Sequence, residues 1–391
     1  MEDSTCSIPA QSALAKLIVK ADLIVWDEIF SCDRYNLECV ERTLRDLMNS
    51  TEIFGGKSIC LGGDPRQTLP VVKRGSRAQI VKVAKNIIAS IAKQIFIQAC
   101  VQMSPLYRHF KEFKLEQNMR TDADELQFSE YILKLGEGKE DIISEINENS
   151  VKIPDKYLVP DINTLIQNVF PNLERKEPDA AGLIEGTIYT PLNKNMKNIN
   201  AICIARFPGE KKTYLSNDTI LQEDQRDSIP EEFLNSLTPS GMPDNQLILK
   251  EGSPVMLLRN LQAGPSCSLR NGTRMIVRHL MKRTIDCEVA VGTNKGTRVF
   301  LPRIPMYDRS NEFPFTLVRR QFPVRLAFAV TINKGQGQEN NRVGIYLPEP
   351  VFAHGQLYTA FSRGKRGDDV SVFIEDNREG FTNNVVYREL L

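Results

Sequence analysis

Two adjacent carboxylates, Asp27 and Glu28, follow an unbroken apolar run from Leu23 to Trp26. The run is too short for a helix and too uniformly apolar for a half-exposed strand, so it predicts a central parallel strand covered on both sides. At the end of such a strand an Asp can hold Mg²⁺, and the neighbouring Glu can orient and deprotonate a water. The pair suits nucleotide hydrolysis, although without context a solvated acidic turn is favoured about two to one.

A second short apolar stretch, residues 57–61, ends in Gly62, Gly63 and a polar cluster that includes Gln67. Glycine lets the backbone approach a ligand closely, and a glutamine can bond both a phosphate oxygen and a water. If the two strands are neighbours, Gln67 lies beside the acidic pair. Two strands that both end in reactive polar groups are less expected by chance than one.

The composition bounds the class of protein. A chain of 391 residues has room for two or three domains, and its net charge of +1 gives no global basic field, so any polyanion site must be a local patch. No apolar run is long enough to span a membrane, and the first residues lack the apolar segment of a secretory signal. Eight scattered cysteines and three histidines favour a reducing compartment and no zinc site, with Cys60 and Cys203 as core residues.

Strand and helix patterns alternate in two regions of the chain. The first region should contain helices at 12–20 and 36–48, a mostly apolar helix at 77–100, a strand at 113–115 and a helix at 124–135. Residues 208–245 resemble a surface insertion, and residues 252–322 contain several short strands typical of a small barrel. The second α/β region should continue with a helix at 327–333, a Gly-rich loop and strands at 343–347 and 370–374.

Two arginines and one loop complete the candidate chemistry. Arg120 and Arg363 could each present a fixed cation to a transferring phosphoryl group, although a lone Arg is more often part of a surface salt bridge. The Gly-rich segment 331–339 holds a Lys, two Gln and a Glu, and could touch both a polyanion and a nucleotide. The alternative for this segment is a helix C-cap followed by a solvated loop.

The motifs WDE, GGDPRQ, NMR, TPLN, TINKGQGQE and LYTAFSR, in this order, resemble motifs II to VI of superfamily-one helicases that move 5′ to 3′. The chain is most similar to the petite integration frequency (PIF-one) type, especially the helicases encoded by Helitron transposons. The stretches ERTLRDLM, GSPVMLLRNL and RRQFPVRLAFA support the likeness outside the motifs. The resemblance covers nearly the whole chain.

The resemblance implies an α/β fold with two RecA-like P-loop-type motor domains, the first incomplete, and a small SH3-like β-barrel inserted in the second. The expected boundaries are 1–138 for the first motor domain, 139–182 for a connector, 183–250 with 323–391 for the second motor domain, and 251–322 for the barrel.

The resemblance also assigns roles. Asp27 would hold Mg²⁺, Glu28 would be the catalytic base, Gln67 would sense the γ-phosphate, and Arg120 and Arg363 would be the arginine fingers. The residues expected to approach the nucleotide are Gly337, Gln338 and Glu339. The residues expected to line a single-strand DNA track are Thr190, Asn193, Thr331, Asn333 and Lys334.

The function implied is ATP-dependent 5′–3′ DNA unwinding with ATP and Mg²⁺ as cofactors, and single-stranded DNA and duplex junctions as partners. The family's roles in DNA repair, recombination, telomere maintenance or Helitron transposition come with it. A monomer without membrane attachment is expected, in the nucleus, with the mitochondrion as the alternative.

Two departures from the family pattern stand out. Nothing in the sequence reads G-x-x-x-x-G-K-[ST], and residues 55–58 (GGKS) precede a predicted strand, so they lack the helix N-terminus that binds phosphate. The family's phosphate loop would lie upstream of Met1, so we expect a chain that lacks its N-terminal portion. The second departure is Gly335, where many relatives have Ser.

The missing loop leaves a second hypothesis open, an ATPase-deficient remnant that at most binds single-stranded DNA. A third, a small-molecule kinase or other P-loop enzyme, fits the TPLN motif and the barrel poorly.

Overall fold

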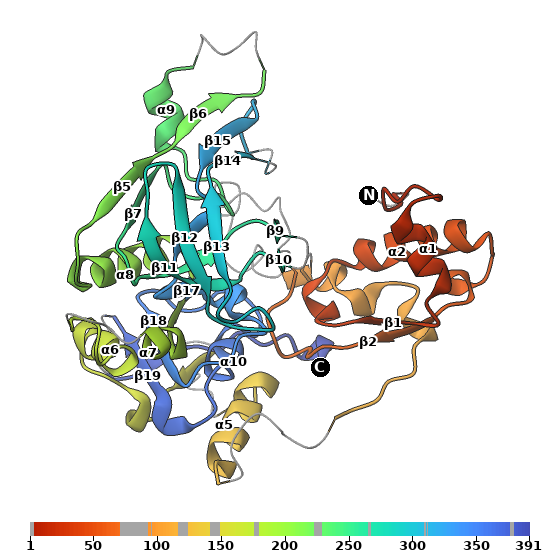
Figure 1. The fold of residues 1–391 in the computed structure, drawn as a ribbon. Helices are drawn as coiled ribbons and strands as arrows, with labels where there is room; N and C mark the ends of the chain where they lie inside the picture. The colour runs from red at the N-terminus through yellow and green to blue at the C-terminus, as the bar shows by residue number, and fades with distance from the viewer. Residues whose placement is uncertain are drawn as a thin grey trace. The chain divides into compact units, whose positions relative to one another are not determined.

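The computed structural model describes residues 4–70, 93–94, 96–115, 124–140, 149–175, 180–222, 229–264, 267–308, 310, 312–375 and 379–391. Arg120 and most of the helix expected at 77–100 lie outside these ranges. The chain divides into two compact units, drawn in Figure 1. The first unit consists of Met1–Val151, Val351–Thr359 and Asn383–Leu391, and the second of Lys152–Pro350 and Ala360–Thr382. The boundaries drawn from the sequence stay predictions.

The first unit contains a parallel pair of strands, β1 (Leu23–Trp26) and β2 (Ser58–Leu61). Alternate side chains of the pair pack on a core that helix α2 (Arg34–Met48) supplies with Leu37 and Leu44. Helix α1 (Ala13–Lys20) precedes β1. Asp33 starts α2 because its carboxylate accepts the Tyr35 N–H at 2.9 Å, as an N-cap residue does.

The prediction that the first strand is covered on both sides is wrong for the described residues. Leu23 is 56% exposed and Val25 65% exposed, and Cys60 on β2 is exposed as well, against the expectation of a core cysteine. Cys203, by contrast, is fully buried as predicted. An apolar run identifies a strand but does not report how many layers cover it.

Two further segments of the first unit can be compared with the helix and the strand that the sequence predicted. Helix α5 (Leu126–Glu137) ends at Gly138, which takes φ +62°, as the predicted helix stop requires. The strand expected at 113–115 is absent, and Leu115 is 99% exposed.

The second unit contains a four-stranded parallel sheet in the order β17 (Ala329–Thr331), β4 (Gly186–Thr190), β18 (Arg342–Leu347), β19 (Val370–Ile374). Helices α6 (Ile162–Val169) and α8 (Asn193–Arg206) pack against it, α6 coming from the predicted connector. Their shared core includes Leu165, Ile188, Ile199 and Phe328.

The helix expected at 327–333 is wrong, because these residues form β17 and a 3-10 turn, Ile332–Gly335. Ala329, Val330 and Thr331 are all buried in this short strand. Periodicity alone does not separate a short buried strand from a buried helical segment.

A five-stranded antiparallel sheet lies in the same unit, in the order β13 (Arg298–Pro302), β12 (Thr284–Val289), β11 (Arg274–Leu280), β8 (Pro254–Leu257), β16 (Val324–Leu326). Four of these strands are those expected between residues 252 and 322, whereas β16 follows that range. The SH3-like character of this part stays a prediction.

The segment expected to be a surface insertion builds a small core of its own. Its strand β6 (Asn217–Ile220) pairs with β15 (Leu317–Gln321), which pairs with β14 (Ile304–Tyr307), and helix α9 (Glu231–Ser236) packs on them. Inside, Arg319 and Asp218 form a fully buried ion pair with an Nη2–Oδ2 distance of 2.5 Å. Arg319 also donates to two backbone carbonyls, so the buried charge is well solvated by protein groups.

The remaining elements are short. They are α7 (Ala180–Glu185), α10 (Gln356–Phe361), β3 (Ser150–Lys152), β20 (Phe381–Asn383), the pair β5 (Lys212–Leu215) with β7 (Gln246–Leu249), and the pair β9 (Leu261–Gly264) with β10 (Cys267–Leu269). Among the described residues, no helix has the length and apolar character to cross a membrane.

Candidate functional site

The carboxyl ends of β1 and β2 lie side by side, which meets the condition set above for placing the two polar clusters together. The Gly62 N–H donates to the Trp26 carbonyl at 2.8 Å, and the Ile29 N–H donates to the Gly62 carbonyl at 3.0 Å. A Cβ on Gly62 would lie 3.2 Å from Asp27 Oδ1, so the glycine brings the second loop close to the carboxylate. The acidic pair and the glycines therefore share one sheet edge.

Glu28 has an unusual backbone conformation for a non-glycine residue. Its φ of 56° and ψ of 38° are left-handed, and its N–H donates to Asp27 Oδ1 at 2.9 Å. The Ser31 hydroxyl donates to the Glu28 carbonyl at 2.8 Å and closes the turn. Such a conformation costs free energy and is found preferentially at functional sites.

Asp27 fits a magnesium ligand in chemistry and exposure. Its side chain is solvent-accessible, and its Oδ1 already accepts the Glu28 N–H. No group of three or more His, Cys, Asp or Glu side chains that could hold a metal occurs in the described part of the chain. An ion here would take one protein carboxylate and complete its shell with water and phosphate oxygens, as Mg²⁺ commonly does.

The loop that carries Gln67 is held by residues from a distant part of the chain that belongs to the same unit. The Tyr358 hydroxyl donates to Asp64 Oδ2 at 2.5 Å, and Arg66 donates through its backbone N–H and Nε to Asp64 Oδ1. A Cβ on Gly355 would lie 2.2 Å from the Arg66 carbonyl, so only glycine fits there. The loop is thus fixed by several independent contacts.

His354 adds a further bond to this loop. Its Nδ1 accepts the Tyr387 N–H at 2.7 Å, so its Nε2 carries the proton and donates to the Pro65 carbonyl at 2.8 Å. The imidazole is almost completely buried, and burial lowers the pKa of His354 below its usual value, although Asp64 and Glu389 act in the opposite direction. His354 is therefore a neutral structural histidine at physiological pH.

Gln67 itself is buried, with a side chain only 6% exposed. Its Oε1 has no hydrogen-bond partner among the described residues. A buried amide oxygen without a donor is costly and is uncommon in folded proteins. The atom is available to accept a hydrogen bond from a water or a ligand.

Arg363 lies in the second unit, two residues beyond α10, whose first turn supplies Tyr358 to the first unit. It is 1% exposed, and its Nη1 donates to the carbonyls of Gln338 at 3.0 Å and Gly335 at 3.3 Å. The structure thus brings Arg363 together with the Gly-rich loop that was expected to approach the nucleotide.

The loop itself is shaped by its glycines. Gly337 has φ +71°, which the turn requires, and the Gln338 side chain donates back to the Lys334 carbonyl at 3.2 Å. Gly335 leaves no room for a side chain, because a Cβ there would lie 2.3 Å from the ring of Tyr189. Glu339 Oε2 lies 3.7 Å from Lys365 Nζ, so the two side chains form an ion pair.

The predicted DNA-track residues gather at the carboxyl ends of β4 and β17. Thr190 and Thr331 are directly opposite each other in the parallel register. Thr190 is fully buried, and its Oγ1 has no partner among the described residues. Asn193 begins α8, while Asn333 and Lys334 lie in the turn that follows Thr331.

Sequence reasoning missed two cations near this cluster, Arg259 and Arg325. Lys334 is an exposed residue, yet partial loss of water around its ammonium lowers its pKa, and the positive charges of both arginines lower it further. The three residues come from separate strands and turns, so no spacing in the sequence links them. The stretch RRQFPVRLAFA, noted for its resemblance, was the available signal for Arg325.

The partial phosphate-loop motif at 55–58 is not a phosphate site. Lys57 Nζ donates to the carbonyls of Val19 at 2.6 Å and Ala21 at 2.8 Å, at the end of α1. Ser58 is the first residue of β2, so the motif precedes a strand as predicted. Lys57 therefore donates to backbone carbonyls at the C-terminal end of α1, as basic side chains near helix ends often do.

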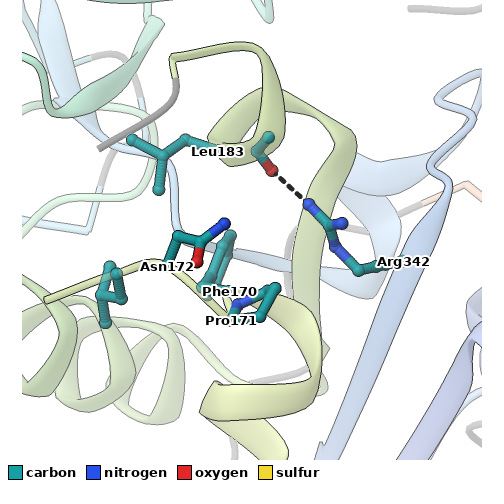
Figure 2. Close-up of a pocket in the computed structure, with 7 residues that line it drawn as sticks. Phe170, Pro171, Asn172, Leu183 and Arg342 are labelled. Atoms are coloured by element: carbon teal, nitrogen blue, oxygen red, sulfur yellow. Dashed lines mark hydrogen bonds between the residues drawn. The ribbon is translucent and has the colours of Figure 1, made fainter. Parts of the chain in front are cut away.

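A cavity between α6, α7 and β18 lies away from these residues. Figure 2 shows its lining, in which Arg342 donates to the Gly182 carbonyl at 2.7 Å. Arg342 starts β18, so the cavity lies at the amino edge of the sheet, opposite the strand ends that hold ligands in such folds. Its volume of about 10 Å³ holds at most one water.

A second cavity, of about 180 Å³, lies in the first unit near the end of α5 and is lined in part by Asn384 and Arg388. None of the predicted site residues lines either cavity.

The predicted site residues thus form two groups. Asp27, Glu28 and Gln67 lie in the first unit, and the loop 335–339, Arg363 and the DNA-track residues lie in the second. Arg120 is outside the described residues.

Comparison with known proteins finds similarity to one family of helicases. The PIF1-like helicase family model matches residues 1–146, and the DNA helicase Pif1 2B domain model matches residues 232–280. The ATP-dependent DNA helicase Pif1 of Campylobacter jejuni is 23% identical over 370 residues, covering 92% of this chain and 71% of the relative. The Xenopus laevis protein PIF1 is 24% identical over 352 residues, covering 89% of this chain and 46% of the relative.

Solved structures share the fold. Bacteroides Pif1 bound to single-stranded DNA aligns with a TM-score of 0.64 and 20% identity, covering 99% of this chain and 78% of that one. Pif1 from Candida albicans aligns with a TM-score of 0.60 and 19% identity, covering 96% and 77%. These structures support the assignment of RecA-like motor domains to the α/β parts of the chain.

Proposed function

We propose that this chain, which is similar to the Pif1-type helicases in sequence and fold, is an ATP-dependent DNA helicase, or the bulk of one. The observation that carries the proposal is the placement of the motif residues at the carboxyl ends of parallel strands in both units. Ligand sites of open α/β sheets lie at such strand ends.

The first unit would supply the hydrolytic groups. Asp27 would hold Mg²⁺, which neutralises phosphate charge when bound, and Glu28 would orient and deprotonate the attacking water. Gln67, with its buried Oε1 lacking a donor, would accept a hydrogen bond from that water while its amide N–H contacts the γ-phosphate. The bonds from Tyr358 and His354 hold the loop of Gln67 in place for this role.

The second unit would supply the strand track and the second cation. Arg363 now donates to the Gly-rich loop, and it would stabilise transition-state charge if those bonds were exchanged for phosphate oxygens. Thr190, Asn193, Thr331, Asn333 and Lys334 would contact single-stranded DNA mainly at its phosphates. We further propose 5′–3′ movement, a monomeric state, action at duplex junctions and a nuclear location.

The printed sequence supplies no G-x-x-x-x-G-K-[ST] loop for the β- and γ-phosphates. Such a loop provides a nest of backbone amides and a Lys, and most of the preorganised stabilisation of those phosphates depends on it. We therefore expect residues 1–391 to bind single-stranded DNA but to hydrolyse ATP weakly on their own.

The test is DNA-stimulated ATP hydrolysis and oligonucleotide binding by purified residues 1–391. We expect measurable binding of a labelled oligothymidylate and a turnover at least about 100-fold below 1 s⁻¹, which is about the lower end of typical enzyme kcat values. Robust turnover that is lost in Glu28→Gln but kept in Glu130→Gln would overturn the expected weakness and would establish the role of Glu28. Glu130 is an exposed residue of α5 and makes the same change of charge away from the site.

Absence of any oligonucleotide binding would count against the helicase function itself. Movement along the strand is tested separately with duplexes that carry a single-stranded tail at the 5′ or the 3′ end, using the longest soluble form of the protein.

A further inference from the structure

Two cysteine side chains meet in the first unit. Cys6 Sγ lies 3.7 Å from Cys39 Sγ, and both residues are partly exposed. Cys6 belongs to the irregular segment before α1, and Cys39 lies on α2. A disulfide bond is about 2.05 Å long, so the two sulfurs must approach by less than about 2 Å to form one.

Several hydrogen bonds hold the segment of Cys6 against α2. The Cys6 N–H donates to Thr43 Oγ1 at 2.8 Å, and the Thr43 hydroxyl donates in turn to the Cys39 carbonyl at 2.8 Å. Arg42 Nε donates to the Ser4 carbonyl at 2.9 Å. Thr43 thus connects the backbones of the two cysteines, so the fold itself keeps their thiols together.

Three other cysteines of the chain are poor nucleophiles by comparison. Cys100, Cys203 and Cys287 are buried, and burial raises the pKa of each thiol to about 12, so they hold little of the thiolate that reacts. Cys32 is partly exposed in the first unit, and burial raises its pKa as well. It is the control thiol for the experiment below.

The environment of Cys39 sets the order in which the pair reacts with an oxidant. Partial burial raises the pKa of Cys39, its contact with Cys6 raises it further, and Arg42 acts in the opposite direction. Cys39 is therefore protonated at neutral pH and reacts slowly with dissolved peroxide. Held 3.7 Å from Cys6, it is placed to react with an oxidised Cys6 instead.

Hydrogen peroxide can oxidise this pair in two steps. Cys6 loses its proton and attacks one peroxide oxygen, the O–O bond breaks, and the other oxygen takes up that proton and leaves as water. The Cys39 sulfur then attacks the sulfenic acid sulfur of Cys6, the S–S bond forms, and the hydroxide leaves with the Cys39 proton as a second water. The two sulfurs together lose two electrons, and the peroxide gains them.

We propose that Cys6 and Cys39 form a reversible disulfide that ties the segment before α1 to α2 when the protein meets hydrogen peroxide. The loop closed by this bond contains α1, β1, Asp27 and Glu28. A cross-link restricts the unfolded states of such a loop and so stabilises the folded form that carries the acidic pair. In a reducing compartment, which the sequence favours, disulfides are transient and respond to oxidants. The bond forms whether or not the chain is a helicase, so the inference goes beyond the proposed function.

The experiment treats the reduced protein with hydrogen peroxide, blocks the remaining thiols with N-ethylmaleimide and identifies tryptic peptides by mass spectrometry without reduction. Trypsin places the first three cysteines of the chain in separate peptides, residues 1–16, 21–34 and 35–42. We expect the first and third of these peptides to be linked, and the link to disappear on treatment with dithiothreitol. The link should be absent from Cys6→Ser and Cys39→Ser and kept in the control Cys32→Ser.

Trp26 reports whether the bond stabilises the loop. It is the single tryptophan of the sequence, it lies inside the loop, and it packs against the core of the first unit. For a loop of this size we expect the oxidised protein, followed by Trp26 fluorescence, to melt on the order of 5 °C above the reduced protein. Cys6→Ser should show no such shift. It keeps the backbone N–H that bonds Thr43, so it carries the test even if Cys39→Ser does not fold.

Three results would overturn the inference. A wild type whose Cys6 is alkylated or oxidised to a sulfonic acid, without linked peptides, would show that the two thiols do not bond. A link of either cysteine to Cys32 would assign the pairing elsewhere. Linked peptides with an unchanged melting temperature of the Trp26 signal would show that the bond does not stabilise the loop.

Discussion

Single side chains decide which parts of this chain can do chemistry. The residues next to Lys57 in the sequence resemble those of a phosphate-binding lysine. Its ammonium, however, donates hydrogen bonds to two carbonyls at the end of α1. Gly335 has no room for a side chain because the Tyr189 ring fills that space. Glu28, in the turn after β1, adopts a left-handed backbone conformation. In each case a local contact settles what the motif left open.

His354 gives a prediction at this scale. Burial lowers its pKa, so in the folded protein it resists protonation, whereas in the unfolded chain it gains a proton below about pH 6.5. The unfolded state then binds more protons, and the free energy of unfolding decreases as pH falls from about 6.5. In His354→Gln, which keeps a donor and an acceptor but does not titrate, we expect this decrease to be smaller by on the order of 1 kcal/mol between pH 7.5 and 5.

Urea denaturation at the two pH values measures the difference. His109→Gln is the matched control, because His109 is an exposed residue of the same unit. Equal pH dependence in His354→Gln and the wild type would contradict the neutral, buried assignment.

At the scale of elements, the second unit depends on how its two main sheets are joined. Arg274 of β11 is buried, and its Nη1 donates to the Ile184 carbonyl at 2.9 Å and to Thr187 Oγ1 at 2.8 Å. Its Nη2 donates to the carbonyls of Gly186 at 3.1 Å and Ala327 at 3.3 Å. One guanidinium thus links the five-stranded sheet to the start of β4.

Replacing this residue tests the junction. Arg274→Met keeps much of the side-chain volume but leaves several buried acceptors without donors, and each such group costs about 1–3 kcal/mol. We expect the unfolding free energy of the second unit to fall by about 3 kcal/mol or more, measured by denaturant unfolding. Arg278→Met on the same strand removes a partly exposed ion pair and should cost less than about 1 kcal/mol. Similar losses in the two variants would show that Arg274 is not a special link.

The elements also show how far the sequence could be read. The strands that precede Asp27 and Gly62 and the four predicted strands of the five-stranded sheet were predictable, because apolar runs bounded by polar residues or glycines are local signals. The exposed face of β1 was not predictable from the sequence, since the layers that cover a strand come from elsewhere in the chain. The strand at 329–331 was taken for a helix because three buried residues have no diagnostic period.

The site divides in the same way. Motif residues at strand ends were found from their types and order, and the structure places Thr190 opposite Thr331 and Arg363 beside the Gly-rich loop. Arg259 and Arg325 were missed, because their meeting with Lys334 depends on strand pairing between segments that are far apart in sequence. The hydrogen bond from His354 to the loop that carries Gln67 was missed for the same reason.

At the scale of the whole molecule, the first unit is assembled from three segments, one of which is the C-terminal stretch Asn383–Leu391. Asn384 donates to the Leu135 carbonyl at 2.8 Å, Arg388 to the Gly138 carbonyl at 2.6 Å, and Gln102 to the Leu390 carbonyl at 2.7 Å. Tyr387 donates to His354, which in turn holds the Gln67 loop. Residues 383–391 therefore support the part of the first unit that carries the Gln67 loop.

Removing this stretch gives a prediction for the whole chain. Deletion of residues 383–391 leaves carbonyls at the end of α5 without their side-chain donors and exposes the packing site of Leu390, at a cost of several kcal/mol. We expect hydrogen exchange to increase in residues 62–68 and 126–138, with the parallel sheet of the second unit unchanged. Substituting the exposed Leu391 by Ser is the control, and protection that stays the same after the deletion would contradict the assignment.

The order of synthesis gives this arrangement a further consequence. A ribosome synthesises the acidic pair and its helices before the sheets of the second unit, whereas residues 383–391, which complete the first unit, follow those sheets in the chain. Synthesis interrupted between residues 375 and 383 would therefore yield a chain whose later-made sheets can form while its earlier-made unit stays open to proteases and chaperones. Quality control in the cell would then act on the earlier segment because of an error in a later one.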